Sequence, residues 1–269
     1  MMKWMEVNGV SLCYELGGRG DETVIFVHES GGSLHSWDET LPTFQEHFRT
    51  LRYDQRGFGL SEKIRGGFVF DEIVEDINGL LAGLGISGPC HLVGSAYGSA
   101  IVLAYAARHP SRVARLAVAS PVTSGGSGGR KAEARELRAA TIEREGMRSY
   151  VTQSLSTSYP EVLRGNIARF EGCRARWLAN DPWCFAALNR MIGEMDLNPE
   201  LSNIESPTLV LGATHDLNRL PELSQSIARQ IRGARFVEVD SGHFLAVQTP
   251  ELFAKMVVPF LQGRDAPRV

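Results

Sequence analysis

The chain has 269 residues, of which 43% are hydrophobic and 22% are charged, the balance of an ordinary globular protein. Its net charge of −3 favours neither nucleic acid nor an anionic membrane as a partner. No run reaches the ~18 apolar residues of a membrane span, and the first residues, MMKWMEVNGV, lack the apolar core of an export signal. We therefore expect a cytoplasmic protein that acts on a small molecule.

The first half of the chain alternates between apolar runs of strand length and stretches of helical periodicity. Asn8-Gly9, between the first two runs, is typical of a hairpin. After it, each strand is followed by a helix, which indicates βαβ units and a mostly parallel sheet. The predicted strands are 4–8, 11–17, 23–29, 49–54, 89–95 and 113–119, and the predicted helices are 35–46, 71–84 and 97–109.

The alternation stops at 121–129, where PVTSGGSGG is typical of a flexible linker. Residues 130–200 have helical patterns throughout. Strands and helices then alternate again, at 207–213, 221–232, 235–240 and 250–262. The simplest interpretation is a core made of 1–122 and 204–269, interrupted by a helical insertion at 123–203.

Two glycines frame position 96 where a predicted strand passes into a predicted helix. The spacing of Gly94 and Gly98 is that of the G-x-S-x-G elbow, which holds a nucleophile at the tip of a strained turn. The framed residue here is Ala96, which has no nucleophilic atom. Ser95 and Ser99 lack the glycine frame, so we interpret them as packing or helix residues.

Asp216 and His243 each follow a predicted strand of the second half. With position 96 they give the chain order nucleophile, acid, histidine that is expected of a Ser-His-Asp triad on an α/β sheet. The carboxyl ends of parallel strands meet at one edge, where ligands bind in open α/β sheets. We therefore expect Ala96, Asp216 and His243 to form one site. His215 precedes the acid without metal-ligand partners and is interpreted as a loop residue.

These motifs identify a resemblance that spans the whole chain. It resembles α/β-hydrolase-fold enzymes of the group that includes 3-oxoadipate enol-lactonases, meta-cleavage-product hydrolases and small-molecule esterases. FVHESGGSLHSW at 26–37 is similar to the group's HG-x-x-G oxyanion loop, and YDQRGFGLS at 53–61 to its D-x-R-G-x-G-x-S stretch. The resemblance implies a mostly parallel eight-stranded sheet flanked by helices, with 123–203 as a helical cap. It implies no cofactor and no metal, and it allows a homodimer.

The resemblance also implies roles for individual residues. The backbone N–H groups of Ser30 and Tyr97 would be the oxyanion donors, and His28 would brace the oxyanion loop. Glu29 departs from the group's glycine, and its carboxylate would point either to solvent or to the substrate. Structural roles are implied for Asp54, Arg56, Gly57 and Gly59, and candidate pocket residues are Glu29, Trp177, Trp183, Met195 and Phe244.

The expected reaction is hydrolysis of a small carboxylic ester or lactone. With serine at position 96, His243 would take its proton, Asp216 would orient the imidazole, and water would release an acyl-enzyme. Alanine at this position indicates either an inactivated serine hydrolase or a natural non-hydrolytic member. The intact acid, histidine and glycine frame favour the inactivated hydrolase.

Three alternatives to ester or lactone hydrolysis stay open. The same triad hydrolyses C–C bonds in vinylogous diketones. A His-Asp dyad can also deprotonate a substrate in a cofactor-free enzyme, and the chain could be a ligand-binding module.

The four cysteines, Cys13, Cys90, Cys173 and Cys184, are scattered without a CxxC pair. This spacing favours four reduced and mostly buried thiols over disulfides or a zinc site.

Overall fold

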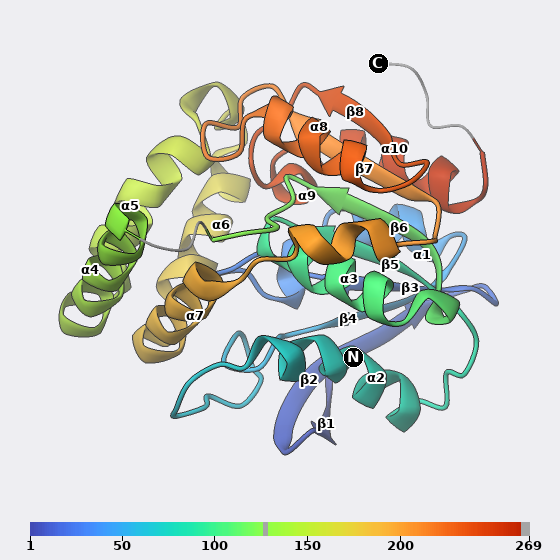
Figure 1. Cartoon of the computed structure of the whole chain (residues 1–269), viewed down its shortest axis with the longest axis horizontal. Helices are drawn as coiled ribbons and strands as arrows, with labels where there is room; N and C mark the ends of the chain where they lie inside the picture. The colour runs from blue at the N-terminus through green and yellow to red at the C-terminus, as the bar shows by residue number, and fades with distance from the viewer. Residues whose placement is uncertain (126–128, 265–269) are drawn as a thin grey trace.

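The protein is described by a computed structural model that covers residues 1–125 and 129–264, without the side chains of 129–132. Over these residues one sheet has the strand order β1-β2-β4-β3-β5-β6-β7-β8 (Figure 1). β1 and β2 form an antiparallel hairpin, β2 pairs antiparallel with β4, and the other neighbours are parallel. The strands are β1 (Lys3–Val7), β2 (Val10–Gly18), β3 (Thr23–Val27), β4 (Arg49–Tyr53), β5 (Cys90–Ser95), β6 (Val113–Ala119), β7 (Thr208–Ala213) and β8 (Arg235–Val239). The expected mostly parallel eight-stranded sheet is confirmed.

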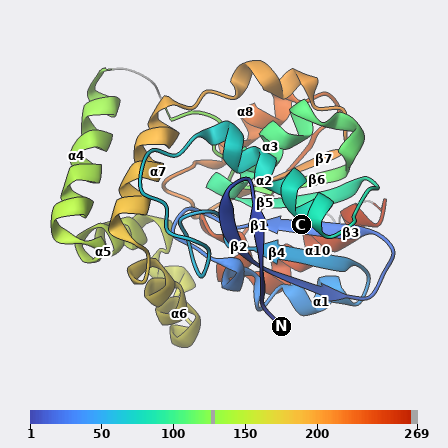
Figure 2. The same ribbon diagram turned by 90° about the horizontal axis from the view of Figure 1, so that it is seen from below.

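Helices cover both faces of the sheet (Figure 2). Successive residues of β3 show why: Val24 and Phe26 pack with α1 and α10, whereas Ile25 and Val27 pack with α2 and α3. The long helices are α2 (Phe70–Gly83), α3 (Tyr97–Arg108), α4 (Gly129–Glu145), α5 (Met147–Ser158), α6 (Ile167–Leu178), α7 (Pro182–Glu194), α8 (Pro221–Gln230) and α10 (Pro250–Leu261). The short ones are η1 (Leu34–Trp37), α1 (Leu41–Gln45), η2 (Pro110–Arg112), η3 (Glu161–Leu163), η4 (Asn198–Asn203) and α9 (Leu245–Gln248). None of the described helices is long and apolar enough to cross a membrane.

Helices α4 to α7 lie together at one end of the molecule in both ribbon views. They contact loops that leave the carboxyl ends of the strands. Asn180, after α6, donates to the carbonyl of Gly31, after β3, at 2.8 Å. Thr157 of α5 donates to Asn218, after β7, at 2.9 Å. The helices of the insertion therefore stand over the edge where the strand ends gather.

Two expected elements differ from the structure. The expected helix 35–46 is divided into η1 and α1, because Pro42 has no N–H to continue a helix and instead occupies the first turn of a new one. The expected linker 121–129 is ordered in its described part. Gly125 and Leu197 donate across a short antiparallel pairing to Met195 and Thr123, at 3.0 and 2.7 Å. Residues 126–128 lie outside the described residues.

All four cysteines are buried and free. Burial raises the pKa of Cys13 and Cys184 to about 11 and that of Cys173 to about 12, and it also raises the pKa of Cys90. Since the thiolate is the reactive form, the native thiols should be inert. We expect a chromogenic disulfide reagent at neutral pH to label no thiol in the native protein and four after unfolding. Fast labelling of the native protein would contradict this burial.

Candidate active site

The turn between β5 and α3 is strained at Ala96. Its φ of 48° and ψ of −113° lie in a region that L-residues rarely adopt. The flanking glycines make this turn possible. A Cβ at Gly94 would lie 2.7 Å from the carbonyl oxygen of Gly98, and a Cβ at Gly98 would overlap the carbonyl oxygen of Val27. Position 96 thus stands at the tip of a sharp strand-to-helix turn that only this glycine frame accommodates.

The residues of the site follow the ends of four neighbouring strands. Ala96, Ser120, Asp216 and His243 follow β5, β6, β7 and β8, which are adjacent and parallel. Backbone hydrogen bonds join the strand ends: Ala96 N–H donates to Ala119 at 2.9 Å, Ser120 N–H to Leu211 at 2.9 Å, and His215 N–H to Ser241 at 2.9 Å. The expected residues therefore lie along one edge of the sheet.

His243 and Asp216 are in direct contact. Nδ1 of His243 donates to Oδ2 of Asp216 at 2.7 Å, which leaves Nε2 as the nitrogen that can take a proton from a bound molecule. The other carboxylate oxygen accepts the N–H groups of Asn218 and Arg219 at 2.9 and 2.8 Å. Burial alone would raise the pKa of Asp216, but the charge and hydrogen bond of His243, with the hydrogen bond from the Arg219 N–H, outweigh it. The pKa of Asp216 lies below its ordinary value.

This lowered pKa has a measurable consequence for stability. A carboxyl group with a lower pKa in the folded state adds stability above its unfolded pKa of about 3.9, and this stability is lost as the pH falls through the folded value. Asp216→Asn should therefore lower the free energy of unfolding most at neutral pH. The difference in unfolding free energy between the two proteins should become smaller as the pH falls towards ~3. Urea unfolding of both proteins across this range measures the difference. A difference that did not change with pH would contradict the assignment.

The loop after β3 is held by His28. Nε2 of His28 accepts the N–H of Gln55 at 3.1 Å, so Nδ1 carries the proton and donates to the carbonyl of Glu29 at 2.8 Å. The N–H of Ser30 makes no backbone hydrogen bond within the described chain. Tyr97 is the first residue of α3, so its N–H has no acceptor within the helix. Both N–H groups are thus available to an oxyanion.

Glu29 does not point to solvent, which corrects one of the two expectations for it. Its exposed fraction is 1%, and Oε1 accepts the hydroxyl of Ser36 at 2.8 Å. The turn from β3 into η1 brings Ser36 back over the carboxylate. Glu29 is also absent from the lining of the cavity beside His243, so the alternative in which it faces the substrate is not supported in this structure.

A cavity of about 490 Å³ opens beside His243. Of the expected pocket residues, Trp177 and Phe244 line it. Met195 is buried elsewhere. Trp183, in the first turn of α7, is 55% exposed and is not among the residues that line this cavity. The complete lining is Ser30, Arg138, Tyr150, Gln153, Ser154, Ser156, Thr157, Trp177, Asn218, His243 and Phe244.

Most of these lining residues were not predicted from the sequence. The expected pocket residues included three aromatic or thioether side chains besides Phe244, yet hydroxyl and amide groups outnumber the aromatic rings in the lining, because the QSLST segment of α5 faces the cavity. Arg138 of α4 was missed because helical arginines usually belong to a solvated face. His215, by contrast, pairs with Asp240 at 2.8 Å, as expected of a loop residue.

Comparison with known families decides the relationship. A family model described as alpha/beta hydrolase fold matches residues 22–250. The chain belongs to the α/β-hydrolase fold family. This α/β hydrolase superposes on the enol-lactonase from Burkholderia xenovorans LB400 with a TM-score of 0.91 and 30% identity, covering 97% of this chain and 100% of that chain. A hydrolase from Pseudomonas aeruginosa PA01 superposes with a TM-score of 0.89 and 29% identity, covering 97% of this chain and 98% of that chain.

Named relatives are similar to this α/β hydrolase over nearly their whole length. A putative carbamate hydrolase RutD from Pantoea ananatis is 29% identical over 246 residues, 90% of this chain and 88% of the relative. Pyrrolizixenacetamide deacetylase from Xenorhabdus hominickii is 27% identical over 281 residues, 99% and 100% of the two chains. The names of these relatives state hydrolytic reactions, which supports hydrolase chemistry for the family. The described side chains contain no cluster of His, Cys, Asp or Glu arranged to hold a metal ion.

Proposed function

We propose that this chain is an inactivated form of a serine hydrolase that acts on a small-molecule carboxylic ester or lactone. One observation carries the proposal: the backbone at Ala96 keeps the strained φ of a nucleophile elbow, although alanine gains nothing from it. Strain of this kind costs about 1–3 kcal/mol and persists where the surroundings impose it for function. Serine at position 96 would make use of it.

The remaining groups suit acyl transfer. With a hydroxyl at position 96, Nε2 of His243 would accept its proton, and Asp216 would stabilise the imidazolium through the 2.7 Å hydrogen bond. The N–H groups of Ser30 and Tyr97 would stabilise the oxyanion of the tetrahedral intermediate, and losing one such donor typically costs about 10²–10³ in rate. Water activated by the same histidine would then release the acyl group.

Two further observations support the bond type and the size of the substrate. The relatives include an enol-lactonase, a putative carbamate hydrolase and a deacetylase, so attack at an acyl carbon is the common theme. The cavity of about 490 Å³ is within the range of small-molecule sites. We propose that 123–203, which supplies seven of the eleven lining residues, acts as a cap that covers the substrate.

Covalent labelling tests the proposal independently of the substrate. A fluorophosphonate reacts with serine only where a neighbouring base activates it, so the Ala96→Ser protein should be labelled at position 96 and the unaltered chain should not. Ala96→Ser combined with His243→Ala is the matched control and should stay unlabelled. Absence of label from a folded Ala96→Ser protein would contradict the proposed elbow and base.

One observation favours a second candidate. Asp216 is buried and holds the partly buried His243 in a well-oriented pair, even though alanine stands at the nucleophile position. Such a dyad can deprotonate a bound substrate without forming an acyl-enzyme. Loss of a proton from a ligand bound to the unaltered Ala96 chain, abolished by His243→Ala, would support this candidate over the inactivated hydrolase.

A further inference from the structure

A second cavity, of about 310 Å³, opens where the insertion meets the core. Helix α6 supplies one of its walls, and α9 and η1, with the two residues after Trp37, supply the others. It shares no lining residue with the cavity beside His243. Trp177 and Phe244, whose ring centres are 5.3 Å apart, line the first cavity only. The two cavities are therefore separate sites.

Most of the charged side chains in the lining of the second cavity already have partners. Arg169 of α6 pairs with Glu39 at 2.5 Å. Asp38 pairs with His35 at 3.0 Å and also accepts a hydrogen bond from Arg52, which lies outside the lining. These groups hold the walls together, and their charges largely cancel.

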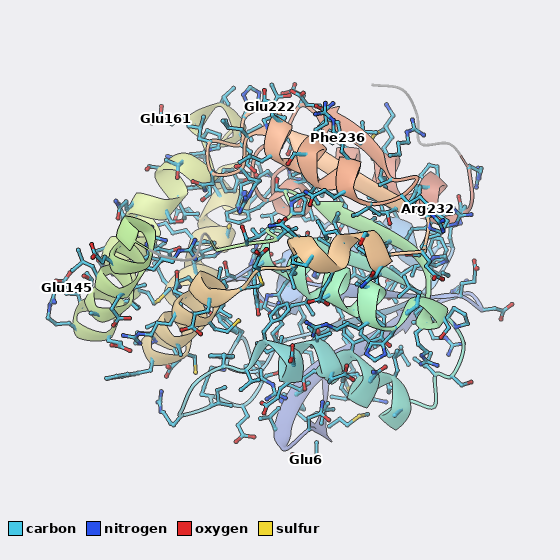
Figure 3. The ribbon with its side chains drawn as sticks, viewed as in Figure 1. Glu6, Glu145, Glu161, Glu222, Arg232 and Phe236 are labelled. Atoms are coloured by element: carbon cyan, nitrogen blue, oxygen red, sulfur yellow. The ribbon has the colours of Figure 1, made fainter. Side chains whose placement is uncertain are left out.

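Arg176 of α6 is the exception in this lining. Its Nε is buried without a hydrogen-bond partner, and in the described part of the chain no carboxylate forms an ion pair with its guanidinium. The acidic residues that precede it do not neutralise it. Glu171 pairs with Arg174 at 3.2 Å, and Glu161 of η3 lies on the outer surface of the molecule (Figure 3).

A buried carboxylate also acts on this region, but it does not pair with Arg176. Burial raises the pKa of the Cys173 thiol, the charge of Glu29 raises it further, and the charge of Arg176 lowers it. Oε1 of Glu29 already accepts the hydroxyl of Ser36, which lines the cavity. A buried donor without an acceptor costs free energy. An acceptor bound in the cavity would offset this cost at Nε of Arg176.

Gly172 leaves room for a ligand beside Arg176. It occupies the middle of α6, where glycine is less favourable than alanine. Apart from the backbone of the helix itself, a Cβ at this position would meet only Nη1 of Arg176, at 3.7 Å, which is an ordinary contact. Packing within the protein therefore does not require glycine here, and the missing side chain widens the cavity at the guanidinium.

We propose that the second cavity binds a small molecule with one carboxylate and a short apolar body, with the carboxylate against Arg176. The guanidinium presents paired N–H donors that match the two oxygens of a carboxylate. Ala246 and Val247 are buried in the lining and would contact the apolar part. The carboxylates of Asp38 and Glu39 would repel a second negative charge. This binding site lies outside the proposed active site and does not depend on the hydrolase proposal.

Titration calorimetry on the unaltered Ala96 chain tests the proposal. The probes are benzoate and benzamide, which have nearly the same shape and differ in charge. We expect the dissociation constant of benzoate to be lower by about tenfold or more, the equivalent of about 1.4 kcal/mol. Arg176→Gln should abolish this preference. Gly172→Leu, which fills the cavity, should weaken the binding of benzoate by a similar factor.

Two control variants remove a different positive charge and keep Arg176. Arg174→Gln changes the same helix outside the lining, and Arg138→Gln changes the cavity beside His243. Both should preserve the preference for benzoate.

Four results would overturn the second site. These are equal binding of the two probes, no binding of either, a preference that survives Arg176→Gln, and a folded Gly172→Leu protein that binds benzoate as tightly as the unaltered chain. Loss of the preference in Arg138→Gln would assign benzoate to the cavity beside His243 and would also refute the proposal. Urea unfolding of each variant shows whether it is folded.

Discussion

Ala96→Ser should raise the rate of ester or lactone hydrolysis by a factor on the order of 10⁶, the scale on which a triad depends on its nucleophile. The exchange adds one oxygen at the tip of a turn whose backbone is already in the required conformation. The base is oriented by its 2.7 Å hydrogen bond to Asp216. Initial rates on short aryl esters, small lactones and a vinylogous diketone, for both proteins at neutral pH, measure the gain.

Two secondary changes test the source of the gain. His243→Ala in the serine protein should abolish it, and Asp216→Asn should reduce it by about 10⁴, because an amide favours the wrong imidazole tautomer. A gain confined to the diketone would favour C–C hydrolysis over ester or lactone hydrolysis. A serine protein that is folded and inert on all three substrate classes would refute the inactivated-hydrolase proposal.

Arg56→Ala should lower the free energy of unfolding by about 3–5 kcal/mol, the usual cost of leaving one member of a buried ion pair alone. Arg56 donates to both carboxylate oxygens of Asp76, at 2.8 and 2.6 Å, and the two side chains are 4% and 1% exposed. Burial raises the pKa of Asp76 even with its partner in place. Without Arg56 the carboxyl group must be buried unpaired or take up a proton. Urea unfolding at neutral pH measures the loss.

Two variants show whether burial is the reason for that loss. Arg56→Met combined with Asp76→Leu removes both charges and should be far less destabilising than Arg56→Ala alone. Arg174→Ala removes a helical ion pair with Glu171 that is partly exposed, at 3.2 Å, and should cost no more than about 1 kcal/mol. Equal losses in Arg56→Ala and Arg174→Ala would show that the Arg56–Asp76 pair contributes little.

The site residues at the carboxyl edge of the sheet were predictable because the sequence patterns that indicate them are local. Gly94 and Gly98 mark the elbow by their spacing, and Asp216 and His243 directly follow apolar strand runs, so chain order and strand context place them at one edge. Their contact at 2.7 Å follows from β7 and β8 being neighbours.

The cavity wall was not predictable in the same way. The side of α4 that carries Arg138 is selected by packing on α5 and α7, and no local pattern distinguishes it from a solvated face. The exposure of Trp183 was not predictable for the same reason, since an aromatic residue in an apolar helix is usually buried. The burial of Glu29 depends on Ser36, seven residues later and beyond a turn.

The close approach of Gly98 to the end of β3 has a consequence for the two N–H groups of Ser30 and Tyr97. A Cβ at position 98 would lie 2.5 Å from the carbonyl oxygen of His28, so any side chain there would drive the start of α3 away from the loop that carries Ser30. The spacing of these two N–H groups is thus set by the direct backbone contact between Gly98 and the end of β3. Substitutions of the cavity-lining residues on α4 and α5 can therefore change which molecule binds without changing the spacing of the Ser30 and Tyr97 N–H groups.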